Sequence, residues 1–327
     1  MVKILRKLLI AILLTITLSS CSNAAEKKEI KPTAIRKGAQ QGMKTYYMGR
    51  FAIDVPEEFK LAAQSHRFRL IEIEEYPDVQ DADQKWREHL AKVGKMHKPK
   101  GVDKIIIKDQ LIEGTGEWAR GVLYYSDYMA DDECNWDVFV SYGNSAALFS
   151  LKGILDKQQS MLAWLQEVVR AYRPISEQRQ LVSGQFHTTH GVIGLPYKRQ
   201  EKTYARFEGP MGMVLKVEMN EIHKAPEKEG IIDRTMAAMA TGFAAGLDIK
   251  KIRSENRTAA GLPGEEEILQ GDDGRHKNVS FDWEYLGSVE SGKQPMIQIS
   301  VDTKDDKLDE KTVIWDKVLD SFRPAYQ

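Results

Sequence analysis

The sequence is poor in cysteine and has no excess of either charge. Two cysteines in 327 residues exclude a small domain held together by disulfides. The 47 Lys and Arg nearly balance the 48 Asp and Glu, so no basic field for nucleic acid and no acidic tail is expected. Only the N-terminus is apolar enough for a membrane, which excludes a polytopic membrane protein. A hydrophobic content of 42% supports packed cores, and the length favours two domains over one.

The first 20 residues have the organisation of a secretory signal peptide. Basic residues precede the apolar run Leu8–Leu18, which is too short to span about 30 Å of hydrocarbon as a helix. The run closes on Leu18, Ser19 and Ser20, and Cys21 follows. This segment resembles the lipobox of bacterial lipoproteins, in which the cysteine receives a diacylglyceryl group and, after cleavage, an acyl chain such as palmitate. An ordinary cleaved signal with an incidental cysteine is the alternative.

The lipobox implies that the mature chain is anchored through Cys21. Several acyl chains, at about 0.8 kcal/mol per buried methylene, would make the anchoring effectively permanent. Ser22 follows the cysteine rather than Asp, which by analogy favours the outer membrane, with the protein facing the periplasm. Residues 21–42 are rich in Lys, Glu, Ala and Gln and predict a flexible tether that reaches roughly 25 Å.

A lipidated Cys21 would leave Cys134 as the single thiol of the mature chain. The acidic residues Asp131, Asp132 and Glu133 precede it, and their charge should raise the pKa of its thiol. A nucleophilic cysteine normally sits in the opposite field. We therefore expect an inert, partly buried Cys134, with a catalytic or intermolecular role as the alternative.

Three pairs of short segments recur in the same order, at offsets that grow from 140 to 150 residues. The last pair carries helical geometry, because apolar residues at i, i+3, i+4 and i+7 form one stripe before each Arg-Pro. We therefore predict two related domains, residues 43–176 and 177–327, joined by a hinge near Ser176–Gly184. Chance matching of apolar strings is the alternative. The pairs are Ile53–Pro56 with Ile193–Pro196, Leu70–Ile73 with Leu215–Glu218, and Val168–Pro174 with Val318–Pro324.

The hydrophobic periodicity predicts the same kinds of element in both halves. Consecutive strands with short connections favour an antiparallel sheet, and we expect helices packed on one face of each sheet, an α+β fold. Helices are predicted near Ala82–His97, Leu165–Tyr172, Ile231–Leu247 and Trp315–Phe322. Strands are predicted near Met48–Val55, Phe68–Glu74, Lys104–Leu111, Trp118–Tyr125, Trp136–Tyr142, Ala146–Lys152, Val192–Leu195, Tyr204–Glu208, Met213–Met219, Glu266–Gln270, Val279–Tyr285 and Met296–Val301.

Motifs that carry chemistry are absent from the sequence. There is no G-x-S-x-G elbow, no G-x-G-x-x-G and no H-E-x-x-H, so we expect no cofactor and no metal. His187 and His190 have the best metal-like spacing, but they lack further ligands and are interpreted as solvated loop histidines. The Met236 and Met239 stripe is interpreted as core, with an adaptable partner groove as the alternative.

Two acidic groups are candidates for partner binding. Asp131, Asp132 and Glu133 form one, and Asp272 and Asp273, between two glycines, form the other. Neither has the alternating oxygen ligands of a calcium loop. Both are interpreted as solvated hairpin tips that can also face a cationic partner.

Four motifs of the mature chain, together with the lipobox, resemble those of a known family. They are Gly49–Pro56, Tyr204–Pro210, Ala260–Glu266 and Phe322–Pro324. The combination resembles the two-domain immunity lipoproteins that neutralise lipase effectors of type VI secretion. The resemblance implies a periplasmic inhibitor that binds a toxic phospholipase and blocks its active site or the opening of its lid. It also implies that the chain has no catalytic residues.

Two other classes remain open from the sequence alone. A non-catalytic envelope lipoprotein would bind a small ligand or an assembly partner, and it should have a concave apolar pocket. A hydrolase with an unrecognised site would use His187, His190 or Cys134, and its turnover should disappear when these side chains are replaced.

Overall fold

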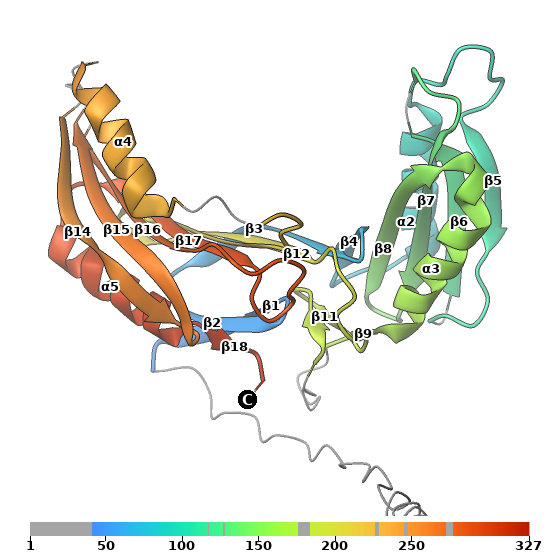
Figure 1. Ribbon diagram of the computed structural model, residues 1–327. Helices are drawn as coiled ribbons and strands as arrows, with labels where there is room; N and C mark the ends of the chain where they lie inside the picture. The colour runs from blue at the N-terminus through green and yellow to red at the C-terminus, as the bar shows by residue number, and fades with distance from the viewer. Residues whose placement is uncertain are drawn as a thin grey trace, which may run out of the picture. The chain divides into compact units, whose positions relative to one another are not determined.

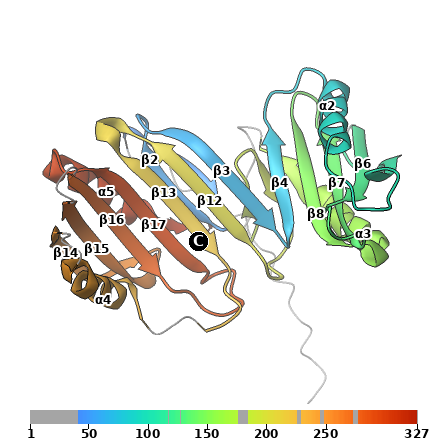
Figure 2. The same cartoon turned by 90° about the horizontal axis from the view of Figure 1, so that it is seen from above.

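The computed structural model describes residues 41–116, 118–126, 128–175, 184–225, 229–244, 248–272 and 277–326 (Figures 1 and 2). The predicted signal peptide, the lipobox with Cys21, nearly all of the tether, hinge residues 176–183 and Asp273 lie outside this part of the chain. Within the described residues, no helix has the length and apolarity needed to cross a membrane.

The strands and α-helices follow each other in the same order twice along the chain, whereas the two 3-10 turns lie at different places. The first series is β1 (Met43–Met48), β2 (Phe51–Pro56), β3 (Lys60–Phe68), β4 (Ile71–Tyr76), α2 (Ala82–Gly94), β5 (Ile106–Leu111), β6 (Trp118–Tyr125), β7 (Glu133–Ser141), β8 (Ala146–Ile154), the 3-10 turn η1 (Leu155–Lys157), α3 (Gln158–Ala171) and β9 (Tyr172–Pro174). The second is β10 (Phe186–His187), β11 (Gly191–Ile193), β12 (Lys202–Glu208), the 3-10 turn η2 (Pro210–Gly212), β13 (Val214–Asn220), α4 (Ile231–Ala244), β14 (Asp248–Ala259), β15 (Leu262–Asp272), β16 (Lys277–Tyr285), β17 (Met296–Lys304), α5 (Leu308–Ser321) and β18 (Arg323–Pro324).

One antiparallel sheet of 12 strands runs through both series in the described residues. Its order is β14-β15-β16-β17-β13-β12-β3-β4-β8-β7-β6-β5. Read outwards from the β12–β3 pair, the two halves have equivalent strands in the same order. The predicted α+β class with antiparallel sheet is therefore confirmed. The repeated order is what a duplication would produce, and the domain boundary at residue 176 stays a prediction.

The opening hairpin of each half pairs with the last strand of the other half. The β1–β2 hairpin pairs with β18, where Ala52 faces Arg323. The β10–β11 hairpin pairs with β9, where Ile193 faces Tyr172. Both receiving strands follow a helix that stops before Arg-Pro, where proline disfavours helical backbone in the residue before it. Because each helix ends before its Arg-Pro, as predicted, the residues that follow form the short strands β9 and β18, and the hairpins pair with these strands.

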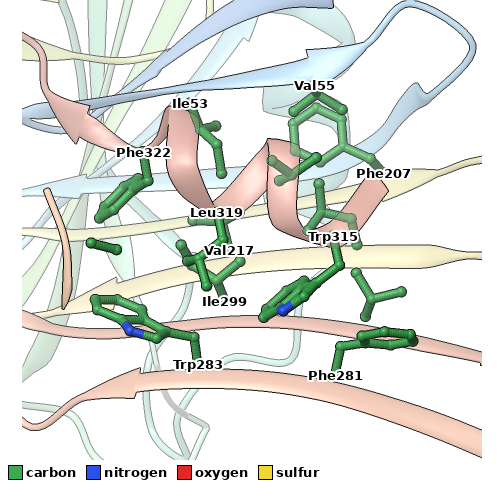
Figure 3. Close-up of a cluster of buried hydrophobic side chains, with 14 of the residues drawn as sticks. Ile53, Val55, Phe207, Val217, Phe281, Trp283, Ile299, Trp315, Leu319 and Phe322 are labelled. Carbon is green, nitrogen blue, oxygen red and sulfur yellow. The ribbon is translucent and has the colours of Figure 1, made fainter. Parts of the chain in front are cut away.

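The helix stripe predicted at the C-terminus is the centre of the larger core (Figure 3). Trp315 and Leu319 of α5 are fully buried. They pack with Ile53 of β2 and with Phe281 and Trp283 of β16 in one cluster. Because burial of a large apolar side chain contributes about 1.5–3 kcal/mol, this junction of chain start and chain end is a main source of stability.

The prediction that the helices pack on one face of each sheet is wrong. In β7, Val138 is buried in the cluster of α3, whereas its neighbour Phe139 is buried in the cluster of α2. In β15, Glu266 faces α5, whereas Glu265 accepts a hydrogen bond from the backbone N–H of Ile232 in α4. Successive side chains of a strand point to opposite faces, so the two helices of each half lie on opposite faces, as Figure 1 shows for α4 and α5.

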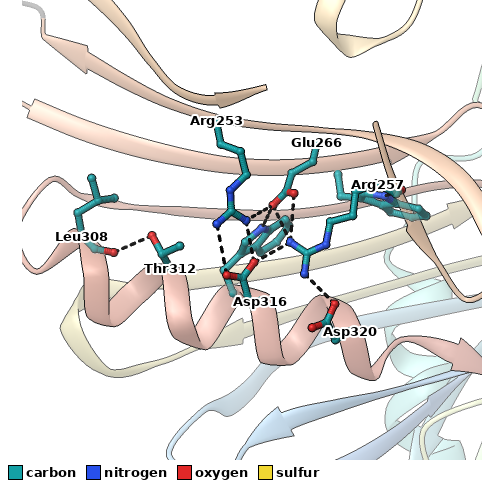
Figure 4. Close-up of polar contacts among 9 residues, drawn as sticks. Arg253, Arg257, Glu266, Leu308, Thr312, Asp316 and Asp320 are labelled. Carbon is teal, nitrogen blue, oxygen red and sulfur yellow. Dashed lines mark hydrogen bonds and ion pairs between the residues drawn. The ribbon is translucent and has the colours of Figure 1, made fainter. Parts of the chain in front are cut away.

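Strand β14, at one edge of the sheet, was not predicted because its sequence is polar. Two of its arginines point toward α5 and meet a carboxylate that is fully buried (Figure 4). Glu266 accepts hydrogen bonds from Arg253 and Arg257 at 3.1 and 2.9 Å and from the Trp315 indole at 2.5 Å. The charges of β14 therefore attach an edge strand to the core.

Asp316 of α5 extends this network toward solvent. It accepts from Arg253 at 2.8 Å and from Arg257 at 2.6 Å. Burial raises the pKa of Asp316, but the two arginine hydrogen bonds outweigh it and the net shift is downward. The aspartate therefore stays ionised and shares the two arginines with Glu266 (Figure 4).

The substitution Glu266→Gln should lower the free energy of unfolding by about 3 kcal/mol, because it removes the buried carboxylate that the two guanidinium groups share and leaves them only the partly exposed Asp316. Urea unfolding measures the change. Glu310→Gln is the matched control, since Glu310 is 64% exposed and lies 4.0 Å from Lys307; we expect less than about 0.5 kcal/mol there. Equal effects at both positions would contradict a stabilising role for the network.

Candidate protein-binding surface

The acidic group at residues 131–133 lies at the tip of the β6–β7 hairpin, as predicted. The backbone N–H of Ser126 donates to the carbonyl of Glu133 at 3.2 Å and closes the loop. The carbonyl of Asp132 accepts from Leu155 at 2.7 Å, which holds the tip beside the end of β8. Glu133 pairs with Lys152 at 2.5 Å, whereas the Asp131 and Asp132 side chains are exposed.

Large apolar side chains surround this acidic tip. Tyr128 is 63% exposed and Met129 is 80% exposed in the same loop, and Ile154 at the end of β8 is 51% exposed. Exposed aromatic and methionine side chains are enriched at protein interfaces, where they supply area and adaptable packing. The tip therefore combines apolar area with negative charge. We call residues 128–133 and Ile154 the acidic tip.

Asp272, the described residue of the second acidic group, lies at the equivalent hairpin of the other half. Asp272 is the last residue of β15, and Lys277 opens β16 and pairs with it at 3.4 Å. Asp273 lies outside the described residues. Because β15–β16 corresponds to β6–β7 in the repeated order, Asp272 stands at the end of a hairpin equivalent to the one that carries residues 131–133.

Between these hairpins, strands near the middle of the sheet present a polar face. Side chains of β12, β13 and β17 alternate between buried and half-buried positions. Ion pairs cross this face, Lys202 with Glu218 at 3.1 Å and Lys216 with Asp302 at 2.6 Å. Surface pairs of this kind contribute at most about 1 kcal/mol, so a partner can rearrange them at little cost.

Cys134 has the environment of an inert thiol. It is fully buried in β7 and forms no disulfide. Burial raises the pKa of its thiol to about 11. The thiolate needed for attack is therefore scarce at neutral pH.

The interpretation of both histidines as solvated loop residues is wrong for His187. His187 is fully buried in β10, where its ring contacts the rings of Tyr47 and Tyr326, and it shares a hydrogen bond with the Tyr326 hydroxyl. Burial lowers its pKa to about 3. His190 is exposed, and its backbone N–H donates to Glu75 at 2.9 Å. The short Thr-rich segment between them gave no alternation from which the burial of His187 could be predicted.

The structure also bears on the sequence analysis of metal ligands, of the Met236 stripe and of exposed apolar residues. In the described part of the chain, no three His, Cys, Asp or Glu side chains come together in a group that could hold a metal ion. Met236 was interpreted as core but is 59% exposed on α4, so that interpretation is wrong. The sequence also did not single out Tyr128, Met129 or Ile154, because exposed apolar residues at a loop leave no periodic pattern.

The fold is that of solved immunity proteins of the type VI secretion system (T6SS). The apo structure of the immunity protein TplEi from Pseudomonas aeruginosa superposes with a TM-score of 0.73 at 17% identity, covering 88% of this chain and 98% of that chain. A chain of the crystal structure of a Tle4–Tli4 complex gives a TM-score of 0.73 at 18% identity, covering 88% and 99%. TplEi from the same organism, complexed with "L" peptide, gives 0.67 at 18% identity, covering 88% and 99%.

A sequence family is also matched. Residues 188–325 match the family described as Tle cognate immunity protein 4 C-terminal domain. This match and the shared fold confirm the resemblance to type VI immunity proteins that the motifs predicted. No curated protein matches the sequence.

The buried His187 makes stability depend on pH. The unfolded chain protonates this histidine near pH 6.5, but the folded chain does so only near pH 3, so stability falls as the pH falls between these values. From pH 7 to pH 4.5 the loss should be about 2.5 kcal/mol for this one group. In the variant His187→Phe, urea unfolding at the two pH values should show a smaller loss of the free energy of unfolding than in the wild type, by that amount. The exposed-site variant His97→Phe should behave as wild type; an equal loss in all three proteins would contradict the assignment.

Proposed function

We propose that this chain is an immunity protein that binds and inhibits a phospholipase effector of type VI secretion, and that it does so without catalysis. The match of residues 188–325 to the Tle cognate immunity protein 4 family carries the proposal. The fold supports it over 88% of the chain, and one solved relative is in a complex named Tle4–Tli4. Inhibition by occupation of the active site or the lid of the lipase requires a stable surface and no reactive group.

Two side chains that a hydrolase could use, Cys134 and His187, lie in environments that favour a non-catalytic role. The Cys134 thiol is buried with a raised pKa, and the buried His187 imidazole has a pKa far below neutrality. The pocket at the fork of β3 and β4, about 340 Å³, is lined by Glu72, Glu74 and Glu75 among other polar residues. This pocket therefore lacks the apolar lining expected for the alternative, an envelope lipoprotein that binds a small ligand or an assembly partner.

The acidic tip is our candidate for part of the contact with the lipase. A standard protein complex buries about 1,600 Å² in total, and aromatic anchors at its centre supply much of the energy. Tyr128 and Met129 can supply such area, and Asp131 and Asp132 can supply local negative charge. Because the chain as a whole has a net charge of only −1, local groups must provide the electrostatic steering.

Acylation of Cys21 would place the inhibitor at the membrane where a phospholipase acts. The motif Leu18-Ser19-Ser20-Cys21 supports this part of the proposal, together with the tether of residues 21–42. The anchor would face the periplasm, in the inner leaflet of the outer membrane. Bound to lipid, the protein meets an incoming lipase on the surface that the lipase attacks.

Co-expression with the adjacent reading frame, sent to the periplasm, tests the function. We expect the neighbour alone to lyse the cells and release fatty acid from phospholipid. The wild-type chain should prevent lysis and copurify with the neighbour as a stable complex. A neighbour that is harmless in the periplasm would contradict the proposal.

The variant Cys21→Ser separates anchoring from inhibition in the same experiment. It should lose incorporation of a labelled fatty acid and leave the membrane fraction, because the lipobox has no thiol to accept the lipid. The purified variant should still inhibit the lipase in solution. An unmodified wild-type N-terminus, seen by mass spectrometry, would contradict the anchor and leave the inhibitory role standing.

Charge reversal at the hairpin tips should slow association with the lipase. The double variant Asp131→Lys, Asp132→Lys should lower the association rate constant about tenfold at low salt, with a smaller effect at high salt. The variant Asp272→Lys, Asp273→Lys tests the other tip. Glu113→Lys, an exposed site between β5 and β6, is the matched control. Unchanged rates at low salt would remove these tips from the interface.

A further inference from the structure

A charged pocket of about 350 Å³ lies where three segments of the chain meet. Its lining consists of Arg69, Leu70, Trp164, Glu167, Lys198, Arg199 and Gln200. The first two form the turn between β3 and β4, the next two belong to α3, and the last three precede β12. Leu70 and Trp164 are each 40% exposed, so the rim of this basic pocket is apolar.

Arg69 is an unusual residue at such a place, because it is a buried cation. Its side chain is 2% exposed. One terminal nitrogen donates to Glu167 at 2.9 Å and the other to the carbonyl of Pro196 at 2.8 Å. The remaining nitrogen, Nε, is buried and has no hydrogen-bond partner. A buried donor without a partner costs free energy that an incoming acceptor would recover.

The other charges of the lining leave the pocket basic. Lys198 is 61% exposed and lies 3.6 Å from Glu167, a loose pair that keeps its ammonium group in reach of a partner. Arg199 pairs with Glu290 at 2.6 Å. Three cations therefore line the pocket with Glu167 as its single carboxylate. Electrostatic complementarity favours an anionic occupant.

Backbone strain concentrates at the same pocket. Of the eight residues other than glycine with positive φ in the described chain, four line it: Arg69 (52°), Leu70 (65°), Arg199 (113°) and Gln200 (61°). The Leu70 N–H donates to the carbonyl of Gln200 at 3.4 Å, which joins the two strained turns. Strain of about 1–3 kcal/mol per residue persists where the surroundings over-determine it, and such sites cluster at binding sites.

We propose that this pocket receives an acidic side chain of the partner protein, with an apolar residue of the same segment against Leu70 and Trp164. The carboxylate would accept from the Arg69 guanidinium and pair with Lys198. Arginine and tryptophan are the residues most often found as energetic centres of interfaces. This inference rests on the proposed function, since the partner is the lipase, and it adds a second contact apart from the acidic tip.

The test measures affinity for the product of the adjacent reading frame with three variants: Leu70→Gly, Trp164→Ala and Lys198→Glu. We expect each to weaken binding by about tenfold or more. Leu70→Gly should leave the urea midpoint unchanged or raised, because glycine adopts positive φ without strain. A loss of affinity without a loss of stability separates recognition from a structural role.

Matched controls come from the equivalent helix of the other half. Val313→Ala and Lys317→Glu alter exposed positions of α5 and should change affinity less than twofold. Carbodiimide treatment of the wild-type complex should also join the Lys198 amine to an Asp or Glu of the partner. If the wild type binds and all the pocket variants bind with unchanged affinity, the pocket assignment alone is overturned. If the wild type does not bind, the function on which the assignment rests is overturned.

Discussion

The structure depends on the exchange of hairpins between its two halves. The apolar stripe of α5 is covered by Ile53 and its neighbours on β2, and the core beneath α3 is completed by Phe186 and Ile193 of the second hairpin. The hairpins also meet each other, because Gly49 and His187 exchange backbone hydrogen bonds at 2.8 and 2.7 Å. Gly49 has φ of 58°, which favours glycine at this contact. Neither half therefore closes its core with its own residues alone.

The same exchange builds the proposed binding pocket. The hairpin β10–β11 packs on the core of α3, and the chain then passes residues 198–200 before it enters β12 in the other half. These residues meet the β3–β4 turn at the point where the sheet passes from one half to the other. A change in the partner segment can therefore be matched by substitutions in short turns, while the sheet and its cores stay as they are.

The buried polar groups Glu266 and His187 serve the fold. Glu266 is fully buried, yet its position between two arginines and the Trp315 indole connects β14 to α5. His187 is buried and neutral in contact with two tyrosine rings. A protein that acts by occupying a surface of another protein needs such a rigid frame.

Much of the fold could be predicted because the information is local. Period-two alternation located most strands, and the stripes that end at Arg-Pro located α3 and α5 and the repeat that contains them. The acidic hairpin tips could be found for the same reason, since turn residues lie next to alternating strands. The polar strand β14 could not, because its arginines are explained only by Glu266 and Asp316, which come later in the chain.

By itself, therefore, the sequence determined most of the elements, the antiparallel class of the sheet and the resemblance to type VI immunity proteins. The tertiary structure alone decided which face each helix covers, which half each hairpin joins and which three segments line the basic pocket. The physical reason is that these features arise from contacts between residues far apart in the chain, such as Ile53 with Leu319, and no local period of the sequence records them.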